Sequence, residues 1–600
     1  MEFDIARLPE QAVGGSDRPQ RCLRLLDAAL AKALPDFDLE AGLLRAAPPA
    51  DAPPMDPAIR QLPPAERRIH VLQPQYMWAY TQGRGSAAVI GTMAYLYRCP
   101  ESRFHRDSSL LRGVRNGLRA YAERQEPSGD FVFCPAAYSE AFGMHEFAWR
   151  LEPLILAFLW VRDALPEAER RAADEMLRRG CAFLLSRPNT ERCNRGVVWT
   201  ATAALAAHFM QDEAYMHAAR HNWELIQEIF RADGQIHEES GPDSNYSATT
   251  MHHLVMLRLY TGDACLDERI LNCARWHTRM RDSRGVPFEG MSTRTCLLGV
   301  PQLKARLLPA EFCARLDPFF HVLAERYLAE TERVGAEATG YSANPLIWAR
   351  HVHQAGPAPA AEPEWYREYL QFYSGHASVY LLAKRKYQTA ITFRSRLAMR
   401  GLQTWSYGVE PPLIHPSTKE VSRTVAWGLD TARMDPDPGR FINVVAWAHD
   451  VTDLPAVTVV HSKLLTHYIF SPETLIVVLR GQTGRRITSW AMNCGVVPQP
   501  QLEAARICFG GLRSYIAFHA PPPRLRLGDS AWVAEFECGD GATVFAFAGA
   551  EFRCDASELP NHRLGFSDPS GSYAVTLHGH DGCSFLLNGR LGTMVTVRRT

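Results

Sequence analysis

The sequence has no excess of charge of either sign, because 65 Lys and Arg residues balance 65 Asp and Glu residues over 600 positions. A protein that holds nucleic acid along its phosphate backbone usually carries a basic surplus, so a polyanion bound by bulk charge is disfavoured. The 14 cysteines are scattered and none forms a CxxC pair, which disfavours a zinc ribbon or a thioredoxin-like motif. Cysteines spread in this way are usually reduced, buried thiols.

Long hydrophobic runs are also missing. The apolar stretch LEPLILAFLWV at 151–161 is shorter than the roughly 20 residues of a bilayer-spanning helix. The N-terminal segment MEFDIARLPEQAVGG lacks a basic region followed by an apolar one, so no signal peptide is visible. We therefore expect a cytoplasmic protein without a membrane partner, or a secreted or periplasmic one if a signal peptide has been removed.

A length of 600 residues exceeds what one core normally holds, so two or three domains are expected. The part of the chain before residue 355 has the pattern of helices. Apolar residues recur at helical spacing in segments that short polar or Pro/Gly breaks separate. These segments are 76–98, 106–124, 139–164, 166–186, 195–210, 213–231, 246–261 and 265–280. Since no strict repeat accompanies them, they predict an (α/α) toroid, an incomplete barrel of helical hairpins, rather than a TPR or HEAT array.

The part after a Pro/Ala-rich linker, QAGPAPAAEPEW at 354–365, is patterned for strands. Segments such as HASVYLLAKR, KYQTAITFRSR and TLIVVLRG are rich in β-branched residues and alternate with period two. We expect an α+β multidomain protein, with a toroid domain over 1–353 and an antiparallel β-sheet or β-sandwich domain over 366–600. A smaller β unit is expected from about residue 521.

The first candidate for chemistry is HEESGPDSNYSATTMHH at 237–253. Good N-cap residue types precede Tyr246, so a helix is expected to begin near it. Tyr246 and His253 then lie two helical turns apart on one face. The segment suits either proton transfer or, more simply, a capped helix whose tyrosine packs on its neighbour.

The second candidate is NTERCNRGVVW at 189–199, where a loop enters an apolar helix. The Asn194 side chain donates and accepts without charge, and Arg195 offers a rigid fork suited to a carboxylate. Gly196 allows another backbone or a ligand to approach closely. The simpler interpretation is a helix cap beside a solvated arginine.

The third candidate is YSEAFGMHEFAWRLEP at 138–153, in which His145, Trp149 and Glu152 share a helical face with Arg150 beside them. An aromatic ring among polar and charged groups is typical of a sugar-binding cleft, although a core tryptophan with a satisfied histidine gives the same pattern. A fourth segment, VPFEGMSTRTC at 286–296, offers Arg294 to an acidic substrate or to solvent.

Residues 189–255 resemble the helical-toroid polysaccharide lyases, the group of heparinase II/III-like enzymes, alginate lyases and chondroitin/hyaluronate lyases. In many of these an asparagine stands at the start of an inner helix, and a "DG…E.S..Y" segment further along carries the catalytic tyrosine. Asn194 and DGQIHEESGPDSNYSATTMHH with Tyr246 match these motifs, and EGMSTRT at 289–295 is similar to a substrate-binding arginine loop. The domain order is also that of the group.

The resemblance implies β-elimination on a polysaccharide that contains uronic acid, such as an alginate or a glycosaminoglycan. Tyr246 would be the general acid or base, Asn194 with Arg195 or a histidine would neutralise the uronate carboxylate, and His253 or His145 would be the base if tyrosine acts only as acid. Substrate contacts are expected from residues that line a cleft in such enzymes. These are Arg195, Trp149, Arg150, Arg294 and Glu239.

The sequence departs from the group's pattern in three places. Several relatives have Asn-His where this chain has Asn194-Arg195, and the segment Pro242–Asn245 lengthens the approach to the tyrosine. The β-domain histidine of heparinase-like enzymes matches His415, His461 or His467, and the sequence does not choose among them. The identity of the uronate polymer, endo or exo action and the oligomeric state also stay open.

Two other functions fit the same residues. A glycoside hydrolase would pair two carboxyl groups, with Glu146 or Glu152 facing Glu238, Glu239 or Asp243. A carbohydrate-binding relative would keep the toroid without catalysis. No cofactor and no metal are expected, because the histidines of HGHDG at 578–582 are better explained by a polar turn.

Overall fold

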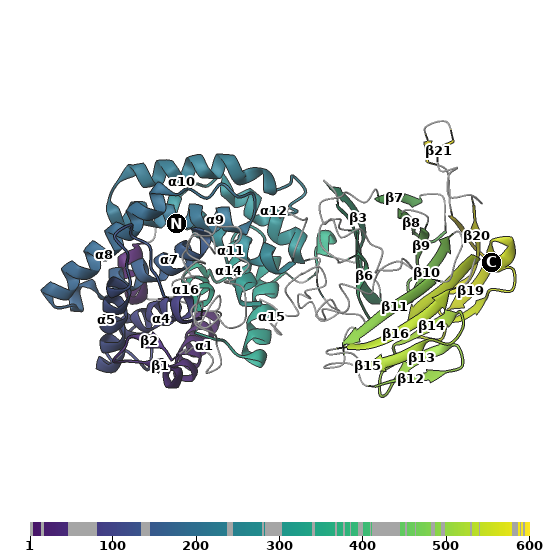
Figure 1. Ribbon diagram of the computed structural model, residues 1–600, viewed down its shortest axis with the longest axis horizontal. Helices are drawn as coiled ribbons and strands as arrows, with labels where there is room; N and C mark the ends of the chain where they lie inside the picture. Colours follow the sequence, from purple (N-terminus) through teal and green to yellow (C-terminus); the bar gives the residue numbers. More distant parts are fainter. Residues whose placement is uncertain are drawn as a thin grey trace, which may run out of the picture. The chain divides into compact units, whose positions relative to one another are not determined.

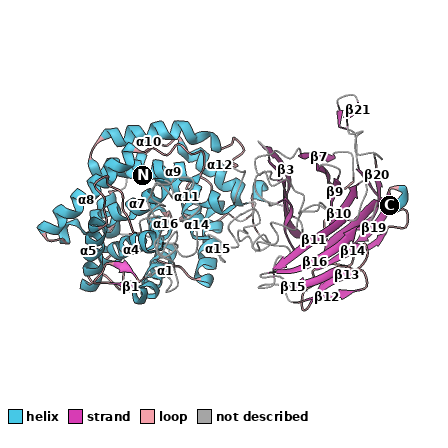
Figure 2. Ribbon diagram, viewed as in Figure 1, coloured by secondary structure: helices cyan, strands magenta, loops and turns pink. Residues whose placement is uncertain are grey.

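The structure is a computed structural model. It describes residues 4–11, 13, 17–45, 81–133, 144–236, 244–278, 281, 303–338, 343–359, 361–366, 369–375, 378–384, 386–393, 400–407, 410, 444–449, 453–461, 464–481, 486–493, 499–527, 531–538, 541–578, 586–587, 590–591 and 595–600. In some of these segments the side chains are not described, including all those of 369–384, 444–449 and 486–493 and most of those of 387–407. The described residues form two compact units, one of helices and one of β-sheets (Figures 1 and 2). Most of the second unit is the segment Glu364–Thr600.

The first unit is built from helices whose order follows the apolar segments of the sequence. They are α1 (Asp17–Ala33), α4 (Ser86–Arg98), α5 (Ser108–Glu123), α7 (Met144–Val161), α8 (Glu167–Ser186), α9 (Asn194–Met210), α10 (Glu213–Ile226), α11 (Ser244–Thr261), α12 (Leu266–Thr278), α14 (Leu303–Cys313), α15 (Phe319–Val334) and α16 (Ala343–Val352). The π-helical turn η5 (Thr81–Gly85) leads into α4.

Inner and outer helices differ as their sequences predict. Helix α9, NRGVVWTATAALAAHFM, is apolar on nearly every side and is buried almost throughout. Helix α8, EAERRAADEMLRRGCAFLLS, buries one stripe and leaves its charged face in solvent. Helix α1, the first long helix, packs against α16, the last of the described helices.

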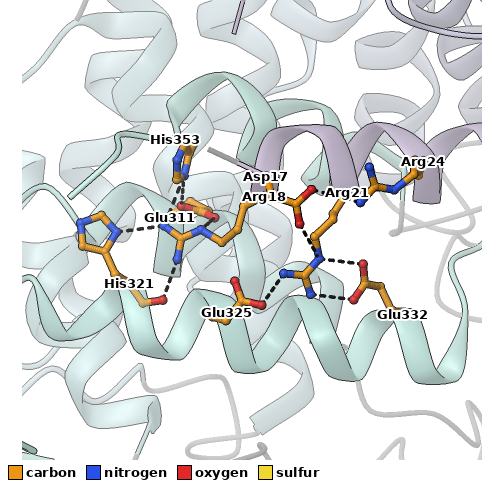
Figure 3. A network of polar contacts seen from close by, with 9 residues as sticks. All are labelled: Asp17, Arg18, Arg21, Arg24, Glu311, His321, Glu325, Glu332 and His353. Atoms are coloured by element: carbon orange, nitrogen blue, oxygen red, sulfur yellow. Dashed lines mark hydrogen bonds and ion pairs between the residues drawn. The ribbon is translucent and has the colours of Figure 1, made fainter. Parts of the chain in front are cut away.

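A polar network holds α1 against α14 and α15 (Figure 3). The Arg18 Nε atom lies 3.2 Å from Oε1 of Glu311 on α14, and the other oxygen of Glu311 lies 2.9 Å from Nδ1 of His353. Arg18 also donates to the carbonyl and to Nδ1 of His321 on α15, at 2.6 and 2.9 Å. One turn further along α1, Arg21 bridges Glu325 and Glu332 of α15. The N-terminal helix is therefore tied to the end of the helical unit by charge as well as by packing.

The second unit consists of antiparallel sheets. A four-stranded sheet has the order β3-β4-β5-β6, an eight-stranded sheet β12-β13-β14-β17-β10-β9-β8-β7, a three-stranded sheet β11-β16-β15, and another four-stranded sheet β18-β19-β20-β23. The strands are β3 (Tyr369–Gly375), β4 (Ser378–Lys384), β5 (Tyr387–Phe393), β6 (Arg400–Tyr407), β7 (Val444–His449), β8 (Ala456–His461), β9 (Leu464–Phe470), β10 (Thr474–Gly481), β11 (Arg486–Asn493), β12 (Pro500–Glu503), β13 (Arg506–Phe509), β14 (Tyr515–His519), β15 (Arg524–Leu527), β16 (Ala531–Cys538), β17 (Gly541–Ala548), β18 (Arg553–Asp555), β19 (Arg563–Asp568), β20 (Gly571–Leu577) and β23 (Val595–Arg599).

A shared core joins two of these sheets. Ile476 and Val478 of β10 and Val544 of β17 cluster with Phe566 of β19 and Val575 of β20. Strands after residue 521 are interleaved with earlier ones, since β16 pairs with β11 and β17 pairs with β10. The expected α+β order, helices first and antiparallel sheets second, is confirmed.

Candidate active site

The helical unit contains a pocket with an empty volume of about 670 Å³, open solvent included. Its lining comes from η5, α4, α7, α11 and α16, so the pocket lies where inner helices meet. Ligand pockets usually combine apolar walls with a few polar groups. Trp149, Leu156 and Trp160 supply apolar wall, and Glu152, His252 and Asn344 supply polar atoms.

The helical repeat explains why α7 supplies the largest share of the lining. Trp149, Glu152 and Leu156 recur at three- and four-residue spacing and share one face of α7. Gly91 of α4 lets Pro153 of α7 come close, because a Cβ atom there would lie 3.2 Å from the proline Cβ. This close packing of α4 on α7 fixes the wall of the pocket.

Arg84 and Trp149 form one side of the pocket. The guanidinium carbon of Arg84 lies 3.8 Å from the centre of the Trp149 ring, a cation–π contact. The Arg84 Nη1 atom is 3.6 Å from Oε1 of Glu146, and both side chains are buried. The positive charge of Arg84 is therefore largely balanced within the protein.

Glu152 lies at the centre of a second polar group. Its Oε1 atom accepts hydrogen bonds from the hydroxyl of Tyr260 at 3.1 Å and from Nδ2 of Asn344 at 3.3 Å. Burial raises the pKa of Glu152 to about 7, although these two hydrogen bonds act in the opposite direction. Near neutral pH this carboxyl group is therefore a weak acid that still holds its proton in a large share of molecules.

Two histidines of α11 complete the pocket. His253 donates from Nδ1 to the carbonyl of Thr249 at 2.8 Å, which leaves Nε2 as its unprotonated nitrogen. Burial lowers the pKa of His253 to about 4, with a further decrease from Arg84. Burial also lowers the pKa of His252 well below its usual value, and the two rings meet edge to face at 4.7 Å. Both imidazoles are therefore neutral at neutral pH.

The pocket thus unites three residues that the sequence singled out, namely Trp149, Glu152 and His253. Tyr246 lies on the same helix as His253, two turns before it, and is half-buried. His145 lies in the first turn of α7, where its side chain is not described. Arg150 is buried on the other side of α7 and donates to the carbonyl of Phe131 at 3.0 Å, outside the pocket lining.

Asn194 and Arg195 open helix α9, and neither lines this pocket. Asn194 is buried, and the Arg195 Nη1 atom lies 3.3 Å from Oε2 of Glu191 in the preceding loop. The close approach expected at Gly196 is confirmed, and the group that approaches is the Glu191 carbonyl, 2.4 Å from where a Cβ atom would stand. This glycine thus serves the tight turn into α9.

Several expected residues lie outside the described part of the chain. These are Glu238, Glu239, Asp243, Arg294 and His415. Of the two remaining β-domain histidines, His461 ends β8 without a described side chain, while His467 is buried in β9 with Nδ1 2.9 Å from the Thr458 hydroxyl.

The sequence interpretation missed Arg84, Tyr260 and Asn344 as members of one site. Arg84 and Asn344 come from segments far from α7 and α11, and no local motif connects them. His252 directly precedes His253 in the sequence, but only the folded structure shows that both residues line the pocket.

Over the described residues, no group of three or more His, Cys, Asp or Glu side chains is placed to hold a metal ion. Within the same residues, no helix combines the length and apolar character that crossing a bilayer requires.

Comparisons with known proteins identify the fold. No protein-family model matches the sequence, and a search of curated proteins gives no match. Among solved structures, Streptomyces coelicolor A3 chondroitin AC lyase in complex with chondroitin sulphate is 12% identical, with 96% of this chain and 88% of that chain covered and a TM-score of 0.58. Heparinase III is 10% identical over 95% of this chain and 99% of its own, with a TM-score of 0.55.

Paenibacillus xanthan lyase is similar in the same way, with 10% identity, coverage of 95% of this chain and 62% of that chain, and a TM-score of 0.55. At such identities the likeness defines the fold. The chain has the fold of the helical-toroid polysaccharide lyases, a helical toroid followed by antiparallel β-sheets, as the sequence resemblance predicted.

Proposed function

We propose that this protein is a polysaccharide lyase that cleaves a uronic-acid-containing polysaccharide by β-elimination. The observation that carries the proposal is a fold shared over nearly the whole chain with solved chondroitin AC lyase and heparinase III, whose helical part in this protein holds an aromatic pocket with acid–base side chains. Fold alone does not establish an activity, so the proposal depends on the side chains of the site as well.

The reaction removes the proton at C5 of a uronate and expels the sugar bonded at C4. The C5 proton is weakly acidic while the adjacent carboxylate is charged, so donors must neutralise that carboxylate and stabilise the enolate. Asn194, at the start of α9, is proposed for this role together with a cation such as Arg195. The Arg195 guanidinium is only 3.3 Å from Glu191, and a uronate carboxylate would compete with that carboxylate for it.

Tyr246 is proposed to protonate the leaving oxygen and, where substrate geometry allows, to remove the C5 proton. Free tyrosine has a pKa of about 10, which suits a general acid better than a general base at neutral pH. If Tyr246 acts only as acid, His253 is the proposed base, with His145 as the alternative. The neutral Nε2 of His253 can accept a proton, but a pKa of about 4 means that it holds that proton weakly.

A glycoside hydrolase is the second candidate function, and Glu152 is the observation that favours it. A carboxyl group with a pKa of about 7 is suited to protonate a glycosidic oxygen. The second carboxylate of that mechanism would come from Glu238, Glu239 or Asp243, outside the described residues.

An assay over a panel of uronate polymers tests the proposal. The full chain is incubated with alginate, hyaluronan, chondroitin and heparan chains, and near-ultraviolet absorbance is followed beside the release of reducing ends. A lyase produces both signals together, because elimination leaves a conjugated double bond at the new end. Reducing ends without absorbance would identify the hydrolase, and binding without either signal would identify a carbohydrate-binding protein.

A further inference from the structure

We infer that the pocket formed by Trp149, Glu152, His252 and Asn344 is a subsite for an uncharged sugar ring, and that these residues select against carboxylated or sulfated sugars at that position. The inference rests on the proposed function in taking a polysaccharide as the ligand. It adds that the polymer carries an uncharged sugar beside the uronate that is cleaved.

The charge balance of the pocket disfavours an anionic sugar group. Among the residues that line it in the described part of the chain, Arg84 is the cation, and its guanidinium is already engaged by Glu146 and by the Trp149 ring. His252 and His253 are neutral at neutral pH, and Glu152 is neutral or negative. An anionic sugar group would lose its hydration in this pocket and would find no cation that is not already engaged. Burying a charge in this way costs free energy.

The pocket also offers buried polar atoms with which the hydroxyl or amide groups of a sugar can form hydrogen bonds. Over the described residues, Nδ1 of His252 and Oδ1 of Asn344 are buried without a hydrogen-bond partner. The His252 side chain is almost completely buried, with 4% of its surface exposed, and it lines the pocket. Buried polar atoms nearly always find a partner, so these two point to a ligand that supplies hydroxyl or amide groups.

Hydrogen bonds within the protein hold Glu152 and Asn344 in place. The Nδ2 atom of Asn344 is held by Glu152 at 3.3 Å, which turns the amide oxygen toward other partners. Tyr260 holds the same carboxyl oxygen from the opposite helix, so Glu152 and Asn344 are fixed before a ligand arrives. The apolar walls of Leu156, Trp160 and Trp149 suit the C–H face of a pyranose.

The subsite is distinct from Tyr246 and Asn194, although the alternative base His253 also lines the pocket. Tyr246 precedes His253 by seven residues on α11, which corresponds to about 10 Å along the helix axis. Neither Tyr246 nor Asn194 lines the pocket. The inference requires that a chain which presents a uronate to Tyr246 places a neighbouring sugar against Glu152 and Asn344.

Direct binding measurements on the full chain test this inference. Ligand-observed saturation-transfer NMR compares N-acetylglucosamine and glucose with glucuronate and 6-sulfated N-acetylglucosamine. We expect N-acetylglucosamine to bind at least about tenfold more tightly than its 6-sulfated form, whereas glucuronate can also bind through its carboxylate at Asn194 and Arg195. The variant His252→Leu is expected to weaken binding of the uncharged sugars by about tenfold, the value of one good hydrogen bond. The matched control His221→Leu, at an exposed histidine of α10, should leave binding unchanged.

A second variant tests the inference by adding a charge, so that the expected result is a change of preference and not a loss of binding. Asn344→Lys places a cation beside Glu152 on a half-buried side chain, and it should shift the preference toward glucuronate. Equal or tighter binding of 6-sulfated N-acetylglucosamine than of N-acetylglucosamine by the wild-type protein would overturn the inference, as would unchanged binding in both His252→Leu and Asn344→Lys. The near-ultraviolet assay is scored separately: sugar binding without elimination would refute the lyase alone, whereas elimination without the binding preference would refute the subsite alone.

Discussion

The Nε2 atom of His253 lies 3.9 Å from the Oε2 atom of Glu152, and both side chains are almost fully buried. His253 already uses its Nδ1 proton in a hydrogen bond to Thr249, so a neutral imidazole nitrogen faces the carboxyl group. Since burial raises the pKa of Glu152 to about 7 and lowers that of His253 to about 4, the proton of the pair resides on Glu152 between these values. The pair is uncharged and stores a proton inside the pocket.

Glu152→Gln should stabilise the protein at alkaline pH more than at acidic pH. The folded-state carboxyl group stays protonated up to about pH 7, while the unfolded one ionises near pH 4.5. The folded state thus binds more protons in this window, and the wild-type free energy of unfolding falls as pH rises through it, by at most about 3 kcal/mol. Urea titrations at pH 5 and pH 8 measure the effect, with exposed Glu175→Gln as control. A gain that is equal at the two pH values would contradict the buried-acid assignment.

His253→Gln should make stability less sensitive to acid. The unfolded histidine takes up a proton near pH 6.5, whereas burial delays protonation in the folded state to about pH 4. Between these values the unfolded state binds more protons, so stability decreases as pH falls. Thermal melts from pH 7 to pH 4.5 should show a smaller decline in Tm for this variant than for the wild type or for His221→Gln. A parallel decline in all three proteins would refute the assignment.

Arg18 and Glu311 should be strongly coupled in stability (Figure 3). Both side chains are mostly buried, and removing one charge leaves the other uncompensated, which typically costs about 3–5 kcal/mol. In a double-mutant cycle, Arg18→Met with Glu311→Leu should therefore cost less than the sum of the single changes. The exposed pair Arg24 and Asp17 of the same helix is the control and should show little coupling. Additive effects at Arg18 and Glu311 would show that α1 is held by packing alone.

Gly196→Ala should destabilise the start of α9. A Cβ atom would stand 2.4 Å from the Glu191 carbonyl, so the loop that precedes Asn194 must move, at about 1–3 kcal/mol. Gly180→Ala on α8 is the control, because its nearest neighbour is the flexible end of Leu151 at 3.1 Å. Denaturant midpoints of the two variants give the comparison, and a larger loss for Gly180→Ala would be contrary to the structure.

The fold was accessible from the sequence because its signals are local and repeated. The segment 195–210 is apolar on all sides and becomes the buried helix α9 (Asn194–Met210), and 166–186 becomes α8 (Glu167–Ser186). The segment 213–231 was predicted too long, since α10 ends at Ile226 and a 3-10 turn with a bridge between Phe230 and Ile236 follows. A local hydrogen-bonded turn there replaces the helical pattern that the apolar residues continue.

The site was accessible only in part because its residues meet through tertiary packing. Trp149, Glu152 and His253 lie on two helices whose patterns mark one face each, so they could be proposed from spacing. Asn344 joins them through the packing of α16 in the ring, which no sequence interval encodes. The raised pKa of Glu152 likewise depends on burial by several helices at once.

Mass spectrometry of the products from a uronate polymer tests the central claim most directly, with wild type, Tyr246→Phe and the control Tyr215→Phe compared. Elimination gives fragments one water lighter than hydrolysis does, so the account predicts unsaturated oligosaccharides from the wild type. It also predicts a loss of about 10²–10⁴-fold in their rate of formation for Tyr246→Phe, with folding and the control unaffected. Fully hydrated fragments, or unsaturated fragments formed at the normal rate by Tyr246→Phe, would contradict it.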